Sequence, residues 1–338
     1  MSCFKHFWLC AVLLGGQWFA VACDLCAIYS ADSARVDRGF RFTISESYIP
    51  YETVQFWGEE ISGRNPDFRD MSITHFVPGY NFIERFGLNL NVPMVFNHFK
   101  RRELRYSTTP PSPVLGVEQG DEVGIGDVSL IARWAFVEKI EMEYEYSATL
   151  LAGVKFPTGN TDRLADEVEQ TQIFESLLPP GTPHDPLGHT ISGVHQHDLS
   201  PGSGSFDGIF GLTWHSRWQR WFFNAQFQYY LRTEGESTFR YGDEIMLSGG
   251  PGAYLLTGRR ATVSLQLNAG FDTMARDELL GRKSDYTGLT AWYLAPQLAL
   301  SVDRFSAVAG VDVPLHITSN GLQNVPDYRL HASFAWRF

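Results

Sequence analysis

The end of the chain constrains the fold more than any other stretch, because its side chains alternate in character up to the last residue. One face of an extended strand would carry Tyr328, Leu330, Ala332, Phe334, Trp336 and Phe338. The other face would carry Arg329, His331, Ser333 and Arg337, with Ala335 as an exception. A strand that crosses a membrane needs about 9–11 residues, apolar toward lipid and polar toward the lumen. The pattern therefore favours a transmembrane β-strand over the last strand of a soluble sandwich.

The terminal aromatic residue predicts two partners. Phe338 closes the alternating strand, as in the C-terminal signal by which bacterial outer-membrane barrels are recognised for assembly. We therefore expect the barrel-assembly machinery to bind this strand. Membrane lipid is expected to surround the folded protein, in the outer membrane of a Gram-negative-type bacterium.

The beginning of the chain predicts export. Lys5 supplies a positive start, residues 7–14 form an apolar run, and Ala20-Val21-Ala22 fits a cleavage site. The run is too short to span a bilayer, and no stretch of about 18 apolar residues follows residue 22. An exported integral protein without such a helix must close its strands into a barrel, because lipid cannot satisfy backbone N–H and C=O groups. We expect 1–22 to be a signal peptide and 23–38 a periplasmic N-terminal segment.

Alternating segments bounded by Gly, Pro, Asn and Asp predict about twelve strands. They lie at 39–50, 70–83, 85–98, 125–138, 144–156, 206–217, 220–233, 240–256, 261–274, 288–302, 305–317 and 328–338. The clearest carries Trp221, Phe223 and Phe227 on one face and Asn224 and Gln228 on the other. The expected fold class is all-β, a transmembrane antiparallel barrel over 39–338.

The connections between these strands alternate in length. Short ones lie near 83–85, 138–142, 218–220, 258–260 and 303–304. Longer ones lie near 51–69, 99–124, 157–205, 234–239, 275–287 and 318–327. Short periplasmic turns and longer external loops are typical of outer-membrane barrels. With an even strand number both termini would be periplasmic, and the loop 157–205 would lie outside the cell or fold inward as a constriction or plug.

Composition agrees with this architecture and excludes one class of partner. Hydrophobic residues make up 44% of the chain and aromatic residues 14%. A barrel has this balance because half of each strand faces water and aromatic girdles mark both membrane interfaces. The net charge of −11, without a Lys/Arg cluster, argues against binding to nucleic acid.

Two cysteines remain after the expected cleavage, as Cys23-Asp24-Leu25-Cys26. Cys23 could be the acylated residue of a weak lipobox. Alternatively, Cys23 and Cys26 could form a disulfide in the oxidising periplasm or bind a soft metal as thiolates. The sequence does not decide between these three interpretations. A lone Cys-x-x-Cys pair supplies only two of the four ligands of a closed zinc site.

Four histidines lie close together in the long loop: His184, His189, His195 and His197. His-x-His places two imidazoles on one side of an extended chain, and Asp185 and Asp198 could complete a divalent-metal site. The alternative is that the histidines are simply solvated. Apart from such a metal, the sequence predicts no cofactor.

Ionisable residues on the lumen-facing side of the predicted strands are candidates for selectivity. They are Arg133, Arg232, Asp272, Asp312, Arg329, His331 and Arg337. Charge inside a barrel tunes selectivity where water or a partner is present, and the alternative is a salt-bridged, packed interior. We do not expect an enzyme, because Ser203 and Ser205 lie in a Gly/Ser turn and not in a nucleophile elbow.

Three segments resemble a known family. They are 80–93 (YNFIERFGLNLNVP), 124–128 (GIGDV) and 153–159 (GVKFPTG), with Asp207-Gly208 and 239–244 (FRYGDE) as weaker similarities. They resemble the outer-membrane transporter-like family named for the meta pathway of phenol degradation, over about 70–338. The resemblance implies a β-barrel related in architecture to channels for long-chain fatty acids and aromatic hydrocarbons, and it implies no catalytic residues.

These observations predict an outer-membrane channel or transporter for a small solute, hydrophobic or metal-linked. Transport would be passive, with the loop 157–205 as the gate. One alternative is a surface protein that binds or senses metal through the His-rich loop. Another is a structural barrel that anchors periplasmic partners through its N-terminus.

Overall fold

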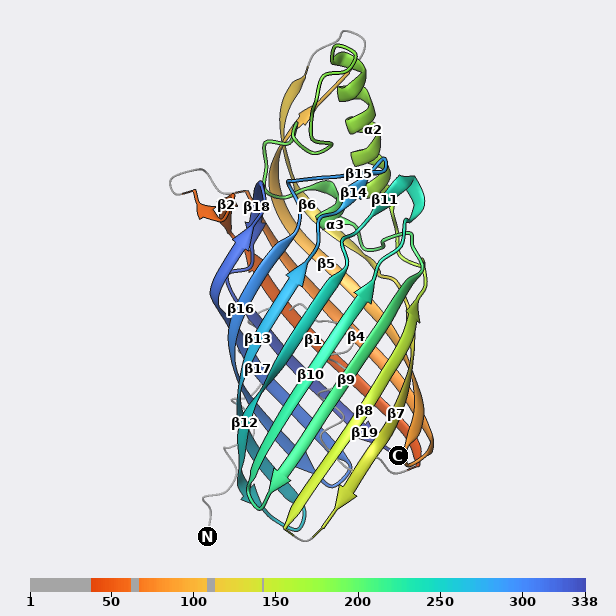
Figure 1. The fold of residues 1–338 in the computed structure, drawn as a ribbon, viewed down its shortest axis with the longest axis vertical. Helices are drawn as coiled ribbons and strands as arrows, with labels where there is room; N and C mark the ends of the chain where they lie inside the picture. The colour runs from red at the N-terminus through yellow and green to blue at the C-terminus, as the bar shows by residue number, and fades with distance from the viewer. Residues whose placement is uncertain (1–37, 62–66, 108–112, 142) are drawn as a thin grey trace, which may run out of the picture.

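The computed structural model describes residues 38–61, 67–107, 113–141 and 143–338 (Figure 1). The expected signal peptide and the pair Cys23 and Cys26 lie outside the described residues. Among the described residues, no helix is both long enough and apolar enough to cross a membrane.

Twelve antiparallel strands form a closed barrel. They are β1 (Gly39–Tyr51), β4 (Phe68–Ile83), β5 (Phe86–Arg105), β7 (Ser129–Ile140), β8 (Tyr144–Lys155), β9 (Asp207–Trp218), β10 (Trp221–Leu231), β12 (Glu244–Thr257), β13 (Ala261–Met274), β16 (Leu289–Val302), β17 (Phe305–Ser319) and β19 (Arg329–Arg337). Each strand pairs with its neighbours in the chain, and β1 closes the ring by pairing with β19, from Arg41 opposite Arg337 to Tyr48 opposite Leu330. The predicted fold class is therefore confirmed.

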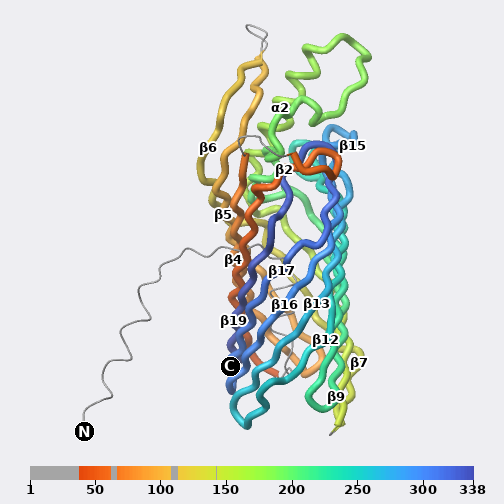
Figure 2. Tube along the Cα trace, turned by 90° about the vertical axis from the view of Figure 1, so that its left-hand side faces the viewer, coloured from red at the N-terminus to blue at the C-terminus, as the bar shows by residue number. Residues whose placement is uncertain are grey.

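The remaining elements lie in the longer connections between these strands. They are β2 (Thr53–Phe56), β3 (Glu59–Glu60), β6 (Val114–Ile125), α2 (Asp162–Leu177), α3 (Gln196–Leu199), η1 (Glu236–Thr238), β11 (Phe239–Arg240), β14 (Glu278–Leu279), β15 (Arg282–Lys283) and β18 (Leu322–Val325). Figures 1 and 2 place α2 and the upper part of β5 and β6 at the end of the barrel opposite the C-terminus.

All short turns lie at one end of the barrel, the short-turn end. The connection between β9 and β10 is only Gln219-Arg220, and the one between β16 and β17 is Asp303-Arg304. Gln219 and Asp303 both have positive φ, which matches the twist of a two-residue hairpin. The C-terminus lies at the same end, where the Phe338 N–H donates to the Phe40 carbonyl (3.0 Å). The opposite end, the long-loop end, carries all the longer connections.

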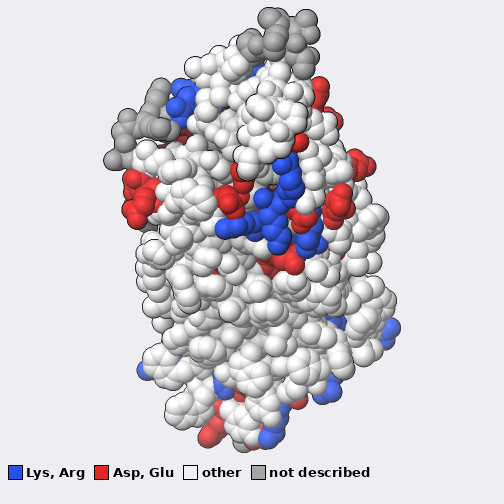
Figure 3. All heavy atoms as spheres, turned by 45° about the horizontal axis from the view of Figure 1, so that its top comes forward, with Lys and Arg blue, Asp and Glu red and all other residues white. Residues whose placement is uncertain are grey.

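The outer surface of the wall is apolar. Leu265 and Leu267 of β13 point outward and are exposed, whereas the residues that alternate with them, Ser264, Gln266 and Asn268, are buried and face the interior. On the face that it draws, Figure 3 shows a broad band with few charged atoms across the middle of the barrel, and Lys, Arg, Asp and Glu gathered toward the two ends. An apolar belt between two polar rims is the surface that a bilayer requires of a spanning barrel.

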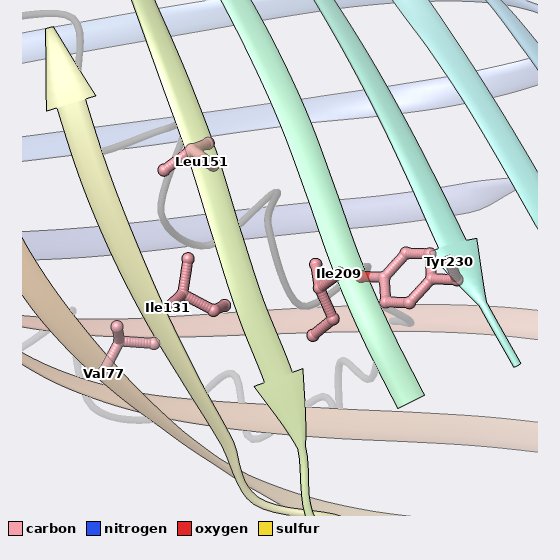
Figure 4. Packing of buried hydrophobic residues seen from close by; sticks show 5 residues of the cluster. All are labelled: Val77, Ile131, Leu151, Ile209 and Tyr230. Carbon is pink, nitrogen blue, oxygen red and sulfur yellow. The ribbon is translucent and has the colours of Figure 1, made fainter. Parts of the chain in front are cut away.

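One part of the interior is apolar as well. Val77, Ile131, Leu151, Ile209 and Tyr230 come from β4 and the consecutive strands β7, β8, β9 and β10, and they pack into one buried cluster (Figure 4). This cluster thickens the wall on one side, so that the remaining bore is narrower than the backbone ring.

The predicted loop over 99–124 was wrong at both ends, because strands cover 99–105 and 114–124. The strand β5 continues to Arg105, and Met94 to Arg105 pair with β6 while Phe86 to Asn91 pair with β7. Gly116, Gly120 and Gly124 make β6 read as a loop, yet it forms a ribbon with β5 above the barrel. A side-chain contact joins its two strands, because Glu118 of β6 accepts from Arg101 of β5 (2.9 Å).

Candidate functional site

The barrel encloses a cavity of about 970 Å³. Residues of every part of the wall line it, and at its lower end Ile140, Thr257 and Thr262 lie beside the short turns. At the long-loop end it is lined by residues of the connection between β8 and β9, among them Gly193 and Ser203. One cavity therefore extends from these loop residues to the short-turn end.

Residues 192–205 lie across the mouth of this cavity, and we call them the cap. The Asn324 N–H of β18 donates to the Gly193 carbonyl (2.8 Å), and Asn97 and Arg101 of β5 donate to the carbonyls of Leu199 and Val194 (both 3.4 Å). Val194 and Leu199 also pack against Phe99 in a buried apolar cluster. The part of the predicted loop 157–205 that lines the cavity is this cap.

A buried lysine fixes the other end of the cap. The Lys155 ammonium lies between Asp127 (3.1 Å) and Asp207 (2.7 Å) and donates to the Ser203 hydroxyl (2.8 Å). Ser203 donates to Asp127 through its hydroxyl (2.6 Å) and its N–H (2.8 Å). These contacts join the cap to β8 and β9. Among the described residues, the Ser203 hydroxyl forms hydrogen bonds with Asp127 and Lys155 and not with a histidine.

Three arginines lie over tyrosine rings just below the cap. Each guanidinium carbon is 4.1–4.7 Å from the centroid of its ring. The pairs are Arg69 over Tyr51, Arg232 over Tyr230 and Arg329 over Tyr293, and all six residues line the cavity. Stacking restricts the long arginine side chains and gives the bore fixed polar edges. Among the described buried groups, the Tyr293 hydroxyl and the Arg329 Nε have no hydrogen-bond partner.

Six of the seven predicted lumen residues line the cavity: Arg133, Arg232, Asp272, Asp312, Arg329 and His331. Several are paired: Arg329 contacts Asp272, and His331 lies 3.5 Å from Asp312. Arg337 is not among the lining residues, because it lies at the short-turn end, where its N–H donates to the Arg304 carbonyl (3.0 Å).

The four predicted histidines separate into two pairs. His195 and His197 are buried in the cap, with Asp198 beside them, and the ligand atoms of these three residues lie within 4.8 Å of one another. His184 and His189 both contact the Phe174 ring of α2, His189 stacked (4.9 Å between centroids) and His184 edge-on (5.9 Å). His184 pairs with Glu175 (3.2 Å), and His189 contacts the Pro186 carbonyl (3.1 Å).

His197 lies between two buried carboxylates. Its Nδ1 is 2.7 Å from Glu167 of α2, and its Nε2 is 3.5 Å from Asp277. Burial lowers the pKa of His197, but these carboxylates and Asp198 outweigh burial and raise it to about 9. Burial and the neighbouring His197 lower the pKa of His195 to about 4. At neutral pH the two imidazoles therefore differ in charge when no other ligand is present.

The site includes two carboxylates that sequence reasoning missed. Burial raises the pKa of Asp277 to about 6, whereas His197 overcomes burial and lowers the pKa of Glu167. Asp277 follows β13, and no local pattern distinguishes it. Glu167 lies in α2, which the prediction treated as loop. The sequence does carry a signal for this helix, because Leu164, Val168 and Thr171 recur at helical spacing and lie on the buried face of α2.

Comparison with known proteins supports the fold. No family model and no curated protein matches the sequence. An outer-membrane channel from Pseudomonas putida F1 has a TM-score of 0.56 at 13% identity, over 90% of this chain and 97% of that one. A FadL homologue from Pseudomonas aeruginosa (TM-score 0.38, 9% identity, 91% and 94% covered) and the CymD monoaromatic hydrocarbon channel (0.40, 9%, 95% and 94%) are more distant.

The first similarity shows that this chain has the fold of an outer-membrane channel. The resemblance to transporter-like outer-membrane barrels is therefore confirmed as a statement about the fold. The other two similarities are too low to carry an argument.

Proposed function

We propose that this protein is a passive outer-membrane channel for a small solute, and that the cap, residues 192–205, gates it. The observation that supports the proposal is one continuous cavity, which reaches the short-turn end and is lined by the cap at the long-loop end. We infer that the short turns face the periplasm, since short turns lie on that side in outer-membrane barrels.

The charges of the lining indicate the class of solute. The lining cations are Arg69, Arg133, Lys155, Arg217, Arg232 and Arg329. The lining carboxylates are Asp127, Glu145, Asp198, Glu244, Asp272, Asp277 and Asp312. Because the two signs nearly balance and tyrosine rings lie among them, the bore has no strong net field. We infer that it favours a neutral or zwitterionic solute with both polar and apolar parts over a simple ion.

Excision of the connecting segment tests the gate. Gly159 and Gly202 lie against each other, and the Gly202 N–H donates to the Asn160 carbonyl (3.0 Å), so deletion of 160–200 leaves two ends that already meet. We expect the deletion to raise conductance in planar bilayers and solute permeability in liposomes. The His184→Ala/His189→Ala variant is the control, because it alters the same segment without touching the cavity lining.

The deletion variant must still shift in electrophoretic mobility on heating, which shows a closed barrel. A folded deletion variant with the conductance of the intact protein would contradict the gating role. If neither protein passes ions or small solutes, the channel proposal itself fails.

A further inference from the structure

We propose that the cap contains a divalent transition-metal site, formed by His195, His197 and Asp198 together with Asp277 from the connection after β13. Glu167 of α2 would orient His197 without touching the metal. The site is independent of transport, because it requires only that these side chains lie where the structure places them.

The donor atoms have a spacing that a metal ion could close. In a tetrahedral zinc site, two ligand atoms are about 3.4 Å apart, given metal–ligand distances near 2.0–2.2 Å. The His197 Nε2 and the Asp277 Oδ2 lie 3.5 Å apart, too far for a good hydrogen bond and close to this edge length. The ligand atoms of His195, His197 and Asp198 lie within 4.8 Å of one another, and Asp277 joins them through its contact with His197.

The partner of the other His197 nitrogen supports the same assignment. A histidine that binds a metal through one nitrogen usually donates its second N–H to a carboxylate, which fixes the ring. The His197 Nδ1 lies 2.7 Å from Glu167, which is itself buried and accepts the backbone N–H groups of Gln196 (3.1 Å) and His197 (3.2 Å). Glu167 is therefore held in place before any ligand arrives.

The surroundings of the cluster restrict water but leave a path to it. The ring of Phe239 lies 5.2 Å from that of His197, and the Tyr241 hydroxyl donates to the His197 carbonyl (2.8 Å). On the other side His195, His197, Asp198 and Asp277 all line the cavity. Two imidazoles and two carboxylates suit Zn²⁺, Ni²⁺ or Cu²⁺ better than the oxygen-seeking Ca²⁺ and Mg²⁺.

The competing explanation is that His197 is a protonated bridge between Glu167 and Asp277, with no metal. The two explanations predict different numbers of bound metal ions per chain and a different release of protons. A metal must displace the proton of His197, so binding releases protons, and the observed heat depends on the ionisation enthalpy of the buffer.

The experiment is calorimetric titration of Zn²⁺ into the full-length protein, without an affinity tag, in detergent and in two buffers. A Cys23→Ser/Cys26→Ser background removes the other candidate ligands. We expect one Zn²⁺ per chain with proton release, and loss of this binding in His195→Ala/His197→Ala. The matched control, His184→Ala/His189→Ala, removes the same number of histidines from the same connection and should bind as the parent does.

Glu167→Gln keeps the shape of the orienting residue, and we expect it to weaken Zn²⁺ binding by about 10–100-fold. Each variant is first checked for heat-dependent mobility, so that a misfolded barrel is not read as a lost site. Equal binding by the His195→Ala/His197→Ala variant and the parent, or no binding by the parent, would overturn the proposal. Neither result depends on whether the protein transports a solute.

Discussion

The barrel wall and the cap are held by different kinds of contact. In the wall, neighbouring strands pair in long ladders, as β13 and β16 do from Ala261 opposite Val302 to Met274 opposite Leu289. In the cap, the anchors are a few side chains from distant parts of the chain. Arg69 donates to the Asp198 carbonyl across 129 residues, and Ser203 reaches Asp127 across 76.

This difference predicts how each region responds to change. Many ladder hydrogen bonds and the contact with lipid together determine the unfolding free energy of the wall. Among single substitutions, we therefore expect only a polar residue on the outer face to lower it strongly. The cap depends on a few buried charges, and removal of one partner leaves another charge buried and unpaired. A single substitution should therefore release the cap while the barrel stays closed.

The largest effect is expected from Lys155→Met. Loss of the ammonium removes the ion pair of the buried Asp127 and leaves Asp207 paired with Arg232 (3.2 Å), at a cost of about 3–5 kcal/mol. Amide hydrogen exchange should show faster exchange in residues 192–205, with heat-dependent mobility retained. Lys139→Met is the matched control, because Lys139 pairs with Glu141 on the surface (2.9 Å) and its loss should leave cap exchange unchanged. If amide exchange in the cap is equally fast in both variants, the cap does not depend on the buried ion pairs of Lys155 as proposed.

A slightly smaller effect is expected from a charge on the outer face of the wall. Leu267→Lys places an ammonium toward lipid near the middle of β13, at a cost of about 2–4 kcal/mol of unfolding free energy. Asn268→Lys, one residue along and facing the cavity, should cost much less. Denaturant unfolding in lipid vesicles measures both. If the two variants lose similar stability, the assigned faces of β13 are wrong.

The smallest effect is expected at the contact between β6 and α2. Burial tends to raise the pKa of Glu118, but hydrogen bonds from Arg163 and Arg101 outweigh burial and lower it below its ordinary value of 4.5. The contact therefore contributes stability above pH 4.5 and loses it as the pH falls through the lowered pKa. Hydrogen exchange in α2 should quicken over that acidic range. Glu118→Gln should abolish this pH dependence, and its persistence in the variant would assign the change to another group.

The wall was predictable from sequence because its signal is local. The predicted strand at 261–274 has the observed bounds of β13, and 220–233 differs from β10 by two residues or fewer at each end. The period-two alternation is imposed by lipid on one side and the lumen on the other, so each strand carries its own evidence. The strand β6 lies above the barrel and has no lipid to impose that pattern, which is why its glycines misled the prediction.

The candidate site was only partly predictable. His195 and His197 stand out in the sequence, whereas Glu167 and Asp277 come near them only when α2 and the connection after β13 fold over the mouth. Sequence spacing also grouped His184 and His189 with them, but these two rings contact Phe174 and are not part of the cluster of His195, His197 and Asp198. Contacts of this kind depend on how the loops pack, and the periodicity of apolar residues in the sequence does not predict loop packing.

The most direct test of the capped cavity is the labelling of one buried thiol from outside the cell. Ser264→Cys, in the Cys23→Ser/Cys26→Ser background, places a thiol on the cavity side of β13. A membrane-impermeant thiol reagent added to whole cells should label it slowly in the intact protein and rapidly once 160–200 are deleted. Equally rapid labelling of both proteins would show that the cap does not close the mouth, and would contradict the account.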